Sequence, residues 1–184
     1  LLLLLRVLLL FGPLAAADLV SIGLAGIAMM TGGGVWWNRC RMIECCTEPY
    51  VQPNFARMER QLRELVYGQH IVLDTVVPAL KAHWSKQPSK PLVLSFNGAT
   101  GSGKNHVARI IANNTYHRGM ASQYVHHIIA TAEFYDRKRM ADYQEQLQKK
   151  LLDAATACDR SLFIFDEVDK LASKLLETVK PFIE

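Results

Sequence analysis

The sequence lacks a Cys-x-x-Cys pair and any long run of Lys or Arg. The first absence disfavours a structural zinc site, because no pair of spaced histidines lies near the cysteines either. The net charge is only +4, and acidic residues are scattered among the basic ones in the second half of the chain, so there is no basic stripe for nucleic acid. Since 50% of the residues are apolar and 21% are charged, the composition is that of a globular protein with room for a targeting segment.

Residues 1–17 are rich in leucine and end in Ala15-Ala16-Ala17. An apolar core closed by small residues is typical of a secretory signal peptide, and we expect cleavage after Ala17. An uncleaved membrane anchor is the alternative, because the apolar character continues beyond this point. The chain begins with Leu1 and stops at Glu184 inside an expected helix, so we interpret it as a piece of a longer protein.

A second apolar stretch follows at residues 18–37. Residues 19–37 carry no charge and approach the length that crosses a bilayer, but the run Gly32-Gly33-Gly34 weakens a spanning helix. Two tryptophans at its end suit a membrane interface. We predict a membrane-associating segment that lies along or dips into one leaflet, with a buried hairpin of the domain as the alternative. Residues 38–54 then form a linker that contains cysteines.

The cysteines are Cys40, Cys45, Cys46 and Cys158. If the signal peptide is correct, the compartment is oxidising, and one or two disulfides are expected. A bridge from one of the first three cysteines to Cys158 would tie the linker to the domain. The sequence does not choose which of the three it is.

A glycine-rich loop with a lysine is the stretch around which the chain is organised. The apolar run 91–97 predicts a buried strand before the loop, and apolar residues at helical spacing in 106–116 predict a helix after it. Strand, glycine loop and helix form the context of a phosphate-binding loop, whose backbone N–H groups surround anionic oxygens at the positive end of the helix. The residues predicted to bind a nucleotide are Gly98, Ala99, Thr100, Gly101, Ser102, Gly103, Lys104 and Asn105.

Two residues of this loop have predicted chemical roles. Lys104 is expected to reach the β- and γ-phosphates and to act in catalysis. Asn105 stands where such loops usually carry a Ser or Thr whose hydroxyl binds Mg²⁺. An amide oxygen is also a hard ligand, so we expect Asn105 to bind the metal instead. The predicted cofactors are ATP and Mg²⁺, and a glycine-rich turn that only packs is the alternative.

A second chemical site is predicted at Asp166 and Glu167. The apolar residues 162–165 before them predict a strand that is buried on both faces, and ligands bind at the carboxyl ends of strands in open α/β sheets. Asp166 is expected to hold the Mg²⁺ shell, largely through water, and Glu167 to polarise the water that attacks the γ-phosphate. If this pair is considered without the glycine loop, the alternative is a solvent-exposed strand end with no chemical role.

The remaining pattern predicts three more helices and one more strand. Helical spacing favours helices at 55–66, from about residue 71 with a kink at Pro78, and at 140–157, while 124–129 is expected to be a strand. The first helix is expected to bury Phe55, Met58, Leu62, Leu65 and Val66. Adjacent strand residues point to opposite faces, so His126 and His127 are not expected to share a metal. Asn113 begins a glycosylation sequon, which counts only if the chain enters the secretory path.

These motifs resemble those of the torsins, AAA+ ATPases of the endoplasmic reticulum lumen and nuclear envelope that are related to the Clp/HSP100 branch. The similarity is carried by the loop 98–105 with its Asn105, and by residues 164–170, which read Ile-Phe-Asp-Glu-Val-Asp-Lys. Glu44-Cys45-Cys46 is a further torsin-like stretch. The resemblance implies an α/β fold, a P-loop NTPase of the AAA+ type with three α/β/α layers, over residues 55–184. It also implies that the Gly68-Gln69 turn lies near the adenine.

The resemblance implies a function as well. Torsins are ATP hydrolases with a chaperone-like role in remodelling proteins or membrane, and they need a membrane-bound activator with a lumenal AAA-like domain to hydrolyse ATP. Further torsin subunits and the membrane surface are the other expected partners, and nucleic acid is not one. The expected location is the lumen of the endoplasmic reticulum and nuclear envelope, in association with the membrane.

The same resemblance implies that the domain is incomplete. In AAA+ sheets the strand with sensor 1 lies between the glycine-loop strand and the strand that ends at Asp166, and this chain stops before it. Sensor 2 and the small helical domain are missing too. We therefore expect two strands without their common neighbour, in a chain that neither hydrolyses ATP nor folds as a stable AAA+ domain. The alternatives are a truncated nucleotide-binding or interaction fragment, and a P-loop kinase, although Asp166-Glu167 suits water activation better.

Overall fold

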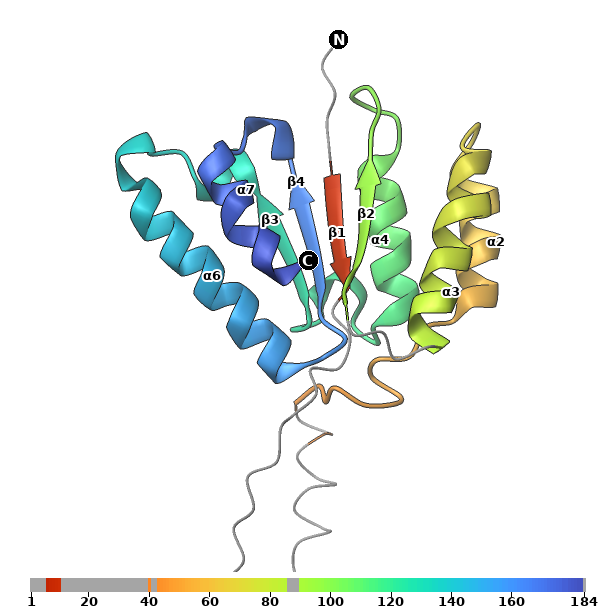
Figure 1. The fold of residues 1–184 in the computed structure, drawn as a ribbon. Helices are drawn as coiled ribbons and strands as arrows, with labels where there is room; N and C mark the ends of the chain where they lie inside the picture. Colours follow the sequence, from red (N-terminus) through yellow and green to blue (C-terminus); the bar gives the residue numbers. More distant parts are fainter. Residues whose placement is uncertain (1–5, 11–39, 41–42, 86–89, 184) are drawn as a thin grey trace, which may run out of the picture.

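The protein is described by a computed structural model that covers residues 6–10, 40, 43–85 and 90–183 (Figure 1). Helices cover both faces of a small sheet, which gives the three-layer α/β/α arrangement that the sequence predicts. None of the helices in these ranges combines the length and apolar character needed to cross a bilayer. The predicted membrane-associating segment, 18–37, lies outside the described residues.

Within the described ranges the sheet has four strands, in the order β2-β1-β4-β3. β3 and β4 are parallel, whereas β1 runs antiparallel to both of its neighbours, β2 and β4. The strands are β1 (Arg6–Leu10), β2 (Leu92–Phe96), β3 (Val125–Ile129) and β4 (Leu162–Asp166). In this register Leu8 lies opposite Leu94 on one side and Ile164 on the other.

The position of β1 differs from the expectation. The resemblance to AAA+ sheets implies a place without a strand between β2 and β4, and the sequence pattern assigns residues 1–17, which include β1, to a signal peptide. In the structure these residues fill that place and pair with both neighbours. Val and Leu are as well suited to a buried strand as to an apolar leader, so the composition does not separate the two states. The prediction that β2 and β4 lack a common neighbour is therefore wrong for a chain that retains residues 6–10. The signal peptide stays a prediction.

The helices follow the strands in the order of a P-loop domain. The longer ones are α2 (Phe55–Leu65), α3 (Val77–Ser85), α4 (Lys104–Thr115), α6 (Met140–Ala157) and α7 (Ser173–Val179). The short segments are the π-helix η1 (Val72–Val76), α5 (Ala130–Glu133) and the 3₁₀ turns η2 (Gly119–Ala121), η3 (Arg137–Arg139), η4 (Val168–Lys170) and η5 (Lys180–Phe182). Pro78 does not end the helix, which runs without a break from the π-helix η1 into α3; the wider π turn, where the i→i−4 hydrogen-bond pattern is interrupted, lies directly before it.

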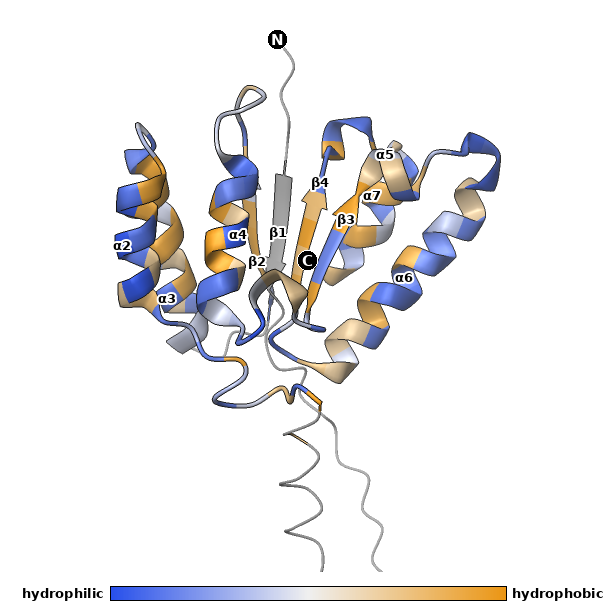
Figure 2. Cartoon of the chain, turned by 180° about the vertical axis from the view of Figure 1, so that it is seen from behind, coloured by the Kyte–Doolittle hydropathy of each residue, from blue (hydrophilic) through white to orange (hydrophobic). Residues whose placement is uncertain are grey.

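Two apolar cores lie on the two faces of the sheet. Alternate residues of a strand point to opposite faces, and β4 is hydrophobic over most of its length (Figure 2). Leu162 and Ile164 pack in the core that contains residues of α2, α3 and α4. Phe163 and Phe165 pack in the core that contains residues of α6 and α7. β4 is thus buried on both faces, as its apolar run predicts.

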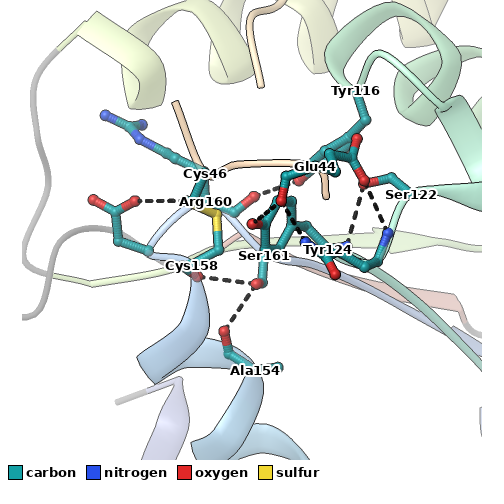
Figure 3. The surroundings of a disulfide bond; sticks show 11 residues. Glu44, Cys46, Tyr116, Ser122, Tyr124, Ala154, Cys158, Arg160 and Ser161 are labelled. Atoms are coloured by element: carbon teal, nitrogen blue, oxygen red, sulfur yellow. Dashed lines mark hydrogen bonds between the residues drawn. A yellow bond between two sulfur atoms is a disulfide. The ribbon is translucent and has the colours of Figure 1, made fainter. Parts of the chain in front are cut away.

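The stretch before α2 packs against the base of the domain (Figure 3). Glu44 is only 3% exposed, and its carboxylate accepts hydrogen bonds from Ser122 Oγ at 2.8 Å and from Gln123 N at 3.1 Å. A disulfide joins Cys46 to Cys158, and a second joins Cys40 to Cys45. The partner of Cys158 that the sequence leaves open is therefore Cys46.

Candidate functional site

The glycine loop lies between the end of β2 and the start of α4. Gly101 and Gly103 have positive φ angles of 82° and 90°, which other residues rarely adopt, so glycine is needed at both positions. The Lys104 ammonium folds into the loop, where Nζ donates to the carbonyl oxygens of Gly98 and Ala99, each at 2.7 Å. It also lies 3.2 Å from Ser102 Oγ. The only cation of the loop therefore lies inside the turn.

The start of α4 adds backbone donors to the loop. The first N–H inside the helix to find an intrahelical acceptor is that of Val107, which donates to Gly103 O at 2.9 Å. The N–H groups of residues 104–106 belong to the first turn, which has no intrahelical partners for them. Together with the positive end of the helix, they form a site suited to phosphate oxygens.

The two predicted metal ligands lie next to each other. Asn105 Nδ2 is 3.5 Å from Asp166 Oδ2, although 61 positions separate the two residues in the sequence. The Asp166 side chain is 13% exposed, and it lies at the carboxyl end of β4. An amide oxygen and a carboxylate are ligands that Mg²⁺ accepts, so this pair fits the predicted metal when the amide turns its oxygen, in place of Nδ2, toward the Asp166 side.

Glu167 follows directly after β4 in an unusual backbone conformation. Its φ angle is 57°, in the left-handed region that costs a residue with a side chain free energy. Thr131 Oγ1 donates a hydrogen bond to Glu167 Oε2, and Lys170 Nζ lies 3.6 Å from Oε1. The carboxylate is therefore held between the start of α5 and η4, beside the phosphate-binding loop.

Two cavities adjoin at the loop and share Ser102 and Lys104. One, of about 390 Å³, is polar and is lined by Thr100, Gly101, Ser102, Gly103, Lys104, Asn105, His106, Asp166 and Glu167. The other, of about 290 Å³, is more apolar and includes Gln69, Ile71, Val72, Thr75 and Val76 with residues of β2. A polyphosphate with its metal would fit the first of these cavities, and a flat apolar group would fit the second.

Gly98 and Ala99, the first two residues of the glycine loop, also take part in its structure. Gly98 lines the more apolar cavity, and a Cβ atom at this position would come within 2.8 Å of Ser102 Oγ. Ala99 O accepts the N–H of Ser102 at 3.2 Å, which closes the turn of the loop. Apart from Ala99, each predicted nucleotide-binding residue of 98–105 thus lines one of the two cavities.

Several residues of the site could not be identified from the sequence. His127 Nε2 lies 3.8 Å from Asp166 Oδ2, and Thr131 holds Glu167. Both contacts result from the parallel pairing of β3 with β4, in which Ile129 lies opposite Asp166. The strand pattern alone indicates β3 but not its neighbour. Ile71, Val72 and Thr75 line the apolar cavity at the π-helix η1, which the helical spacing of the sequence does not distinguish from an α-helix.

The two adjacent histidines of β3 lie on opposite faces of the sheet, as expected. His126 stacks on Phe163 with ring centroids 4.6 Å apart, on the side of α6, whereas His127 lies near Asp166. Burial, with a smaller contribution from Lys150, lowers the pKa of His126 below its usual value. The two rings therefore have different surroundings and cannot ligate one metal.

The sequon residues lie at the end of α4. Asn113 is exposed, and its Oδ1 accepts the N–H of Met120 at 3.2 Å. Thr115 is only 5% exposed, and its Oγ1 donates to Ile111 O. The acceptor asparagine is thus accessible, the threonine is not, and glycosylation at Asn113 stays a prediction.

The fold and the site together define a class of protein. A phosphate-binding loop at the end of β2, an acidic pair at the end of the buried strand β4, and helices on both faces of the sheet are the features of a P-loop nucleotide-binding domain of the AAA+ type. A family profile described as "Torsin" matches residues 40–165. The chain belongs to the torsin family.

The relatives agree with this assignment. The chain is 45% identical over 166 residues to a "Torsin-like protein" of Caenorhabditis elegans, and that match covers 87% of the chain and 47% of the relative. It is 36% identical over 174 residues to a "Torsin-like protein" of Drosophila melanogaster, covering 94% of the chain and 51% of the relative. "Torsin-3A" of Rattus norvegicus is 38% identical over 148 residues, covering 79% and 38%. The chain thus spans about half the length, or less, of these relatives.

Proposed function

We propose that this chain is the nucleotide-binding part of a torsin-type AAA+ ATPase that binds ATP with Mg²⁺. The observation that carries the proposal is the approach of Asn105 Nδ2 to Asp166 Oδ2, at 3.5 Å, beside the loop that encloses Lys104. It brings a cationic phosphate-binding group and two hard metal ligands to one cavity. Family membership supports nucleotide binding at the same coarse level.

The roles of the residues follow from their chemistry. Lys104 would leave the carbonyl oxygens of Gly98 and Ala99 for the more strongly negative β- and γ-phosphates. Asn105 and Asp166 would hold Mg²⁺, which neutralises charge on the phosphates when it is bound. Glu167 would accept a hydrogen bond from water and orient it toward the γ-phosphate. In the described structure that carboxylate is engaged by Thr131, so hydrolysis requires it to turn toward the water.

The wider function is proposed for the protein of which this domain is part. It would use ATP hydrolysis for chaperone-like remodelling of proteins or membrane, in the lumen of the endoplasmic reticulum and nuclear envelope. Its proposed partners are a membrane-bound activator with a lumenal AAA-like domain, further torsin subunits and the membrane surface. The two disulfides support an oxidising compartment, because such bonds rarely persist in the cytosol.

The test is ATP binding by the full chain, measured by isothermal titration with Mg²⁺. Lys104→Ala should weaken binding at least tenfold, because a desolvated ammonium beside phosphate is lost. Lys174→Ala is the matched control, since Lys174 is an exposed lysine of α7 outside both cavities, and it should bind ATP as the unaltered chain does. Equal binding by all three chains, or no binding by the unaltered chain, would contradict the proposal.

A further inference from the structure

A third cavity lies beside the proposed nucleotide site, on the α4 side of the sheet. It has a volume of about 400 Å³, and the basic residues of its lining are Arg109, Arg118 and His127. We call it the arginine cavity. The three residues come from α4, from the turn before η2 and from β3, so three separate elements direct basic side chains into one hollow.

The two arginines have no counter-charge in the described structure. No carboxylate lines the arginine cavity, and neither Arg109 nor Arg118 makes an ion pair or side-chain hydrogen bond with another described residue. Asp166, a carboxylate of the proposed nucleotide site, lies 3.8 Å from His127 Nε2 and 3.5 Å from Asn105 Nδ2, but it does not itself line the cavity. The hollow is therefore positively charged over its rim.

The rest of the lining is apolar or an amide donor. Ala108, Met120 and Ile164 provide the apolar wall. The amide of Asn113 accepts the Met120 N–H through Oδ1, which leaves its Nδ2 as a donor at the edge of the cavity. Guanidinium groups bind carboxylates through paired, charge-assisted hydrogen bonds, and the apolar wall suits a methylene stem or an aliphatic neighbour.

We propose that the arginine cavity is a docking site for an acidic segment of a protein partner, in which a Glu or Asp side chain lies next to an aliphatic residue. The charge complementarity selects an anion, and the apolar wall favours a peptide over a free inorganic ion. Asn105 lines both this cavity and the polar cavity of the proposed nucleotide site, so a docked partner contacts a residue of that site.

The proposal is tested with the full chain, without nucleotide, by fluorescence anisotropy. The probe is a labelled peptide, acetyl-Gly-Glu-Leu-Glu-Gly-amide, and its comparison is the same peptide with Gln in place of both Glu residues. The acidic peptide is expected to bind, and Arg109→Gln combined with Arg118→Gln should weaken it at least tenfold. The matched control is Arg57→Gln with Arg60→Gln, which removes the same charge from exposed positions on α2 and should change binding less than twofold.

Three results would overturn the proposal. Equal weakening in the two double variants would show diffuse attraction instead of a site. Equal binding of the Gln peptide would show that the carboxylates are not recognised. Complete displacement of the peptide by an equal concentration of inorganic phosphate would reassign the cavity to a small anion. If the double variant unfolds in a thermal melt, the single change Arg118→Gln replaces it, because Arg118 lies in an exposed turn. Lys104→Ala should bind the peptide normally, which separates this test from that of ATP binding.

Discussion

Asn105, in the first turn of α4, lies next to Asp166, the last residue of β4, with Nδ2 and Oδ2 3.5 Å apart. Their contact joins the end of the glycine loop to the acidic end of the most buried strand. We therefore expect Asn105→Ala to weaken the dependence of ATP binding on Mg²⁺, because an inner ligand is lost. Calorimetry with and without Mg²⁺ should show about a tenfold loss only when Mg²⁺ is present. Asn105→Ser should retain the dependence, and an equal loss without metal would contradict this role.

The disulfide between Cys46 and Cys158 closes a loop of 112 positions, whereas that between Cys40 and Cys45 closes one of only five. In the chain-entropy description, the longer loop contributes about 5 kcal/mol to the free energy of unfolding and the shorter about 2 kcal/mol. Replacing Cys46 and Cys158 by Ser should lower the urea midpoint by more than twice as much as replacing Cys40 and Cys45. Equal losses from the two pairs would show that loop closure is not the cause.

His126 should make stability depend on pH. Its pKa is lowered in the folded protein, first by burial and then by Lys150, so the unfolded chain binds a proton at a pH where the folded one does not. The free energy of unfolding contributed by this group is constant above the usual pKa of 6.5, and it falls as the pH drops below that value toward the folded pKa.

Urea midpoints at pH 7.5 and 5.5 provide the measurement. His126→Gln should lose less stability between these two pH values than the unaltered chain does. The control is His70→Gln, at an exposed position, which should behave like the unaltered chain. A His126→Gln protein that loses as much stability on acidification as the unaltered chain would rule out this group as the source.

The register of β1 can be tested by cross-linking. Leu9 lies opposite Val93, and directly opposed residues of antiparallel strands have Cα atoms roughly 4.5 to 5.5 Å apart, within disulfide range. Leu9→Cys with Val93→Cys should form a disulfide that mass spectrometry of peptides detects. The control pair, Leu9→Cys with Leu94→Cys, should not, because adjacent strand residues point to opposite faces. Cleavage after Ala17 would remove β1, so absence of the first cross-link in an unprocessed chain would contradict the described sheet.

Much of the fold follows from local pattern. The helix predicted at 140–157 is confirmed as α6, and the strands predicted around the glycine loop and before Asp166 are confirmed within a residue or two. The buried face predicted for α2 is only partly correct. Met58 and Leu62 are fully buried, whereas Leu65, in the last turn, is 49% exposed because the helix ends there and the chain turns away.

What the sequence could not supply depends on contacts between distant residues. The loop 98–105 and the pair Asp166-Glu167 are recognisable because short motifs specify them. His127 and Thr131 reach the same site only through the pairing of β3 with β4, which no local signal encodes. β1 is the same case, since its neighbours β2 and β4 come from much later in the chain.

The central position of β1 in the sheet also affects when the sheet can fold during synthesis of the chain. Residues 6–10 are made before the other three strands of the sheet, and β4, one of the two strands that enclose them, is made after β2 and β3. A strand that pairs across the whole length of a chain makes folding slow and leaves its apolar residues without partners during synthesis. A targeting receptor or chaperone that binds residues 6–10 therefore has all the time until β4 is made in which to bind them before the sheet can close.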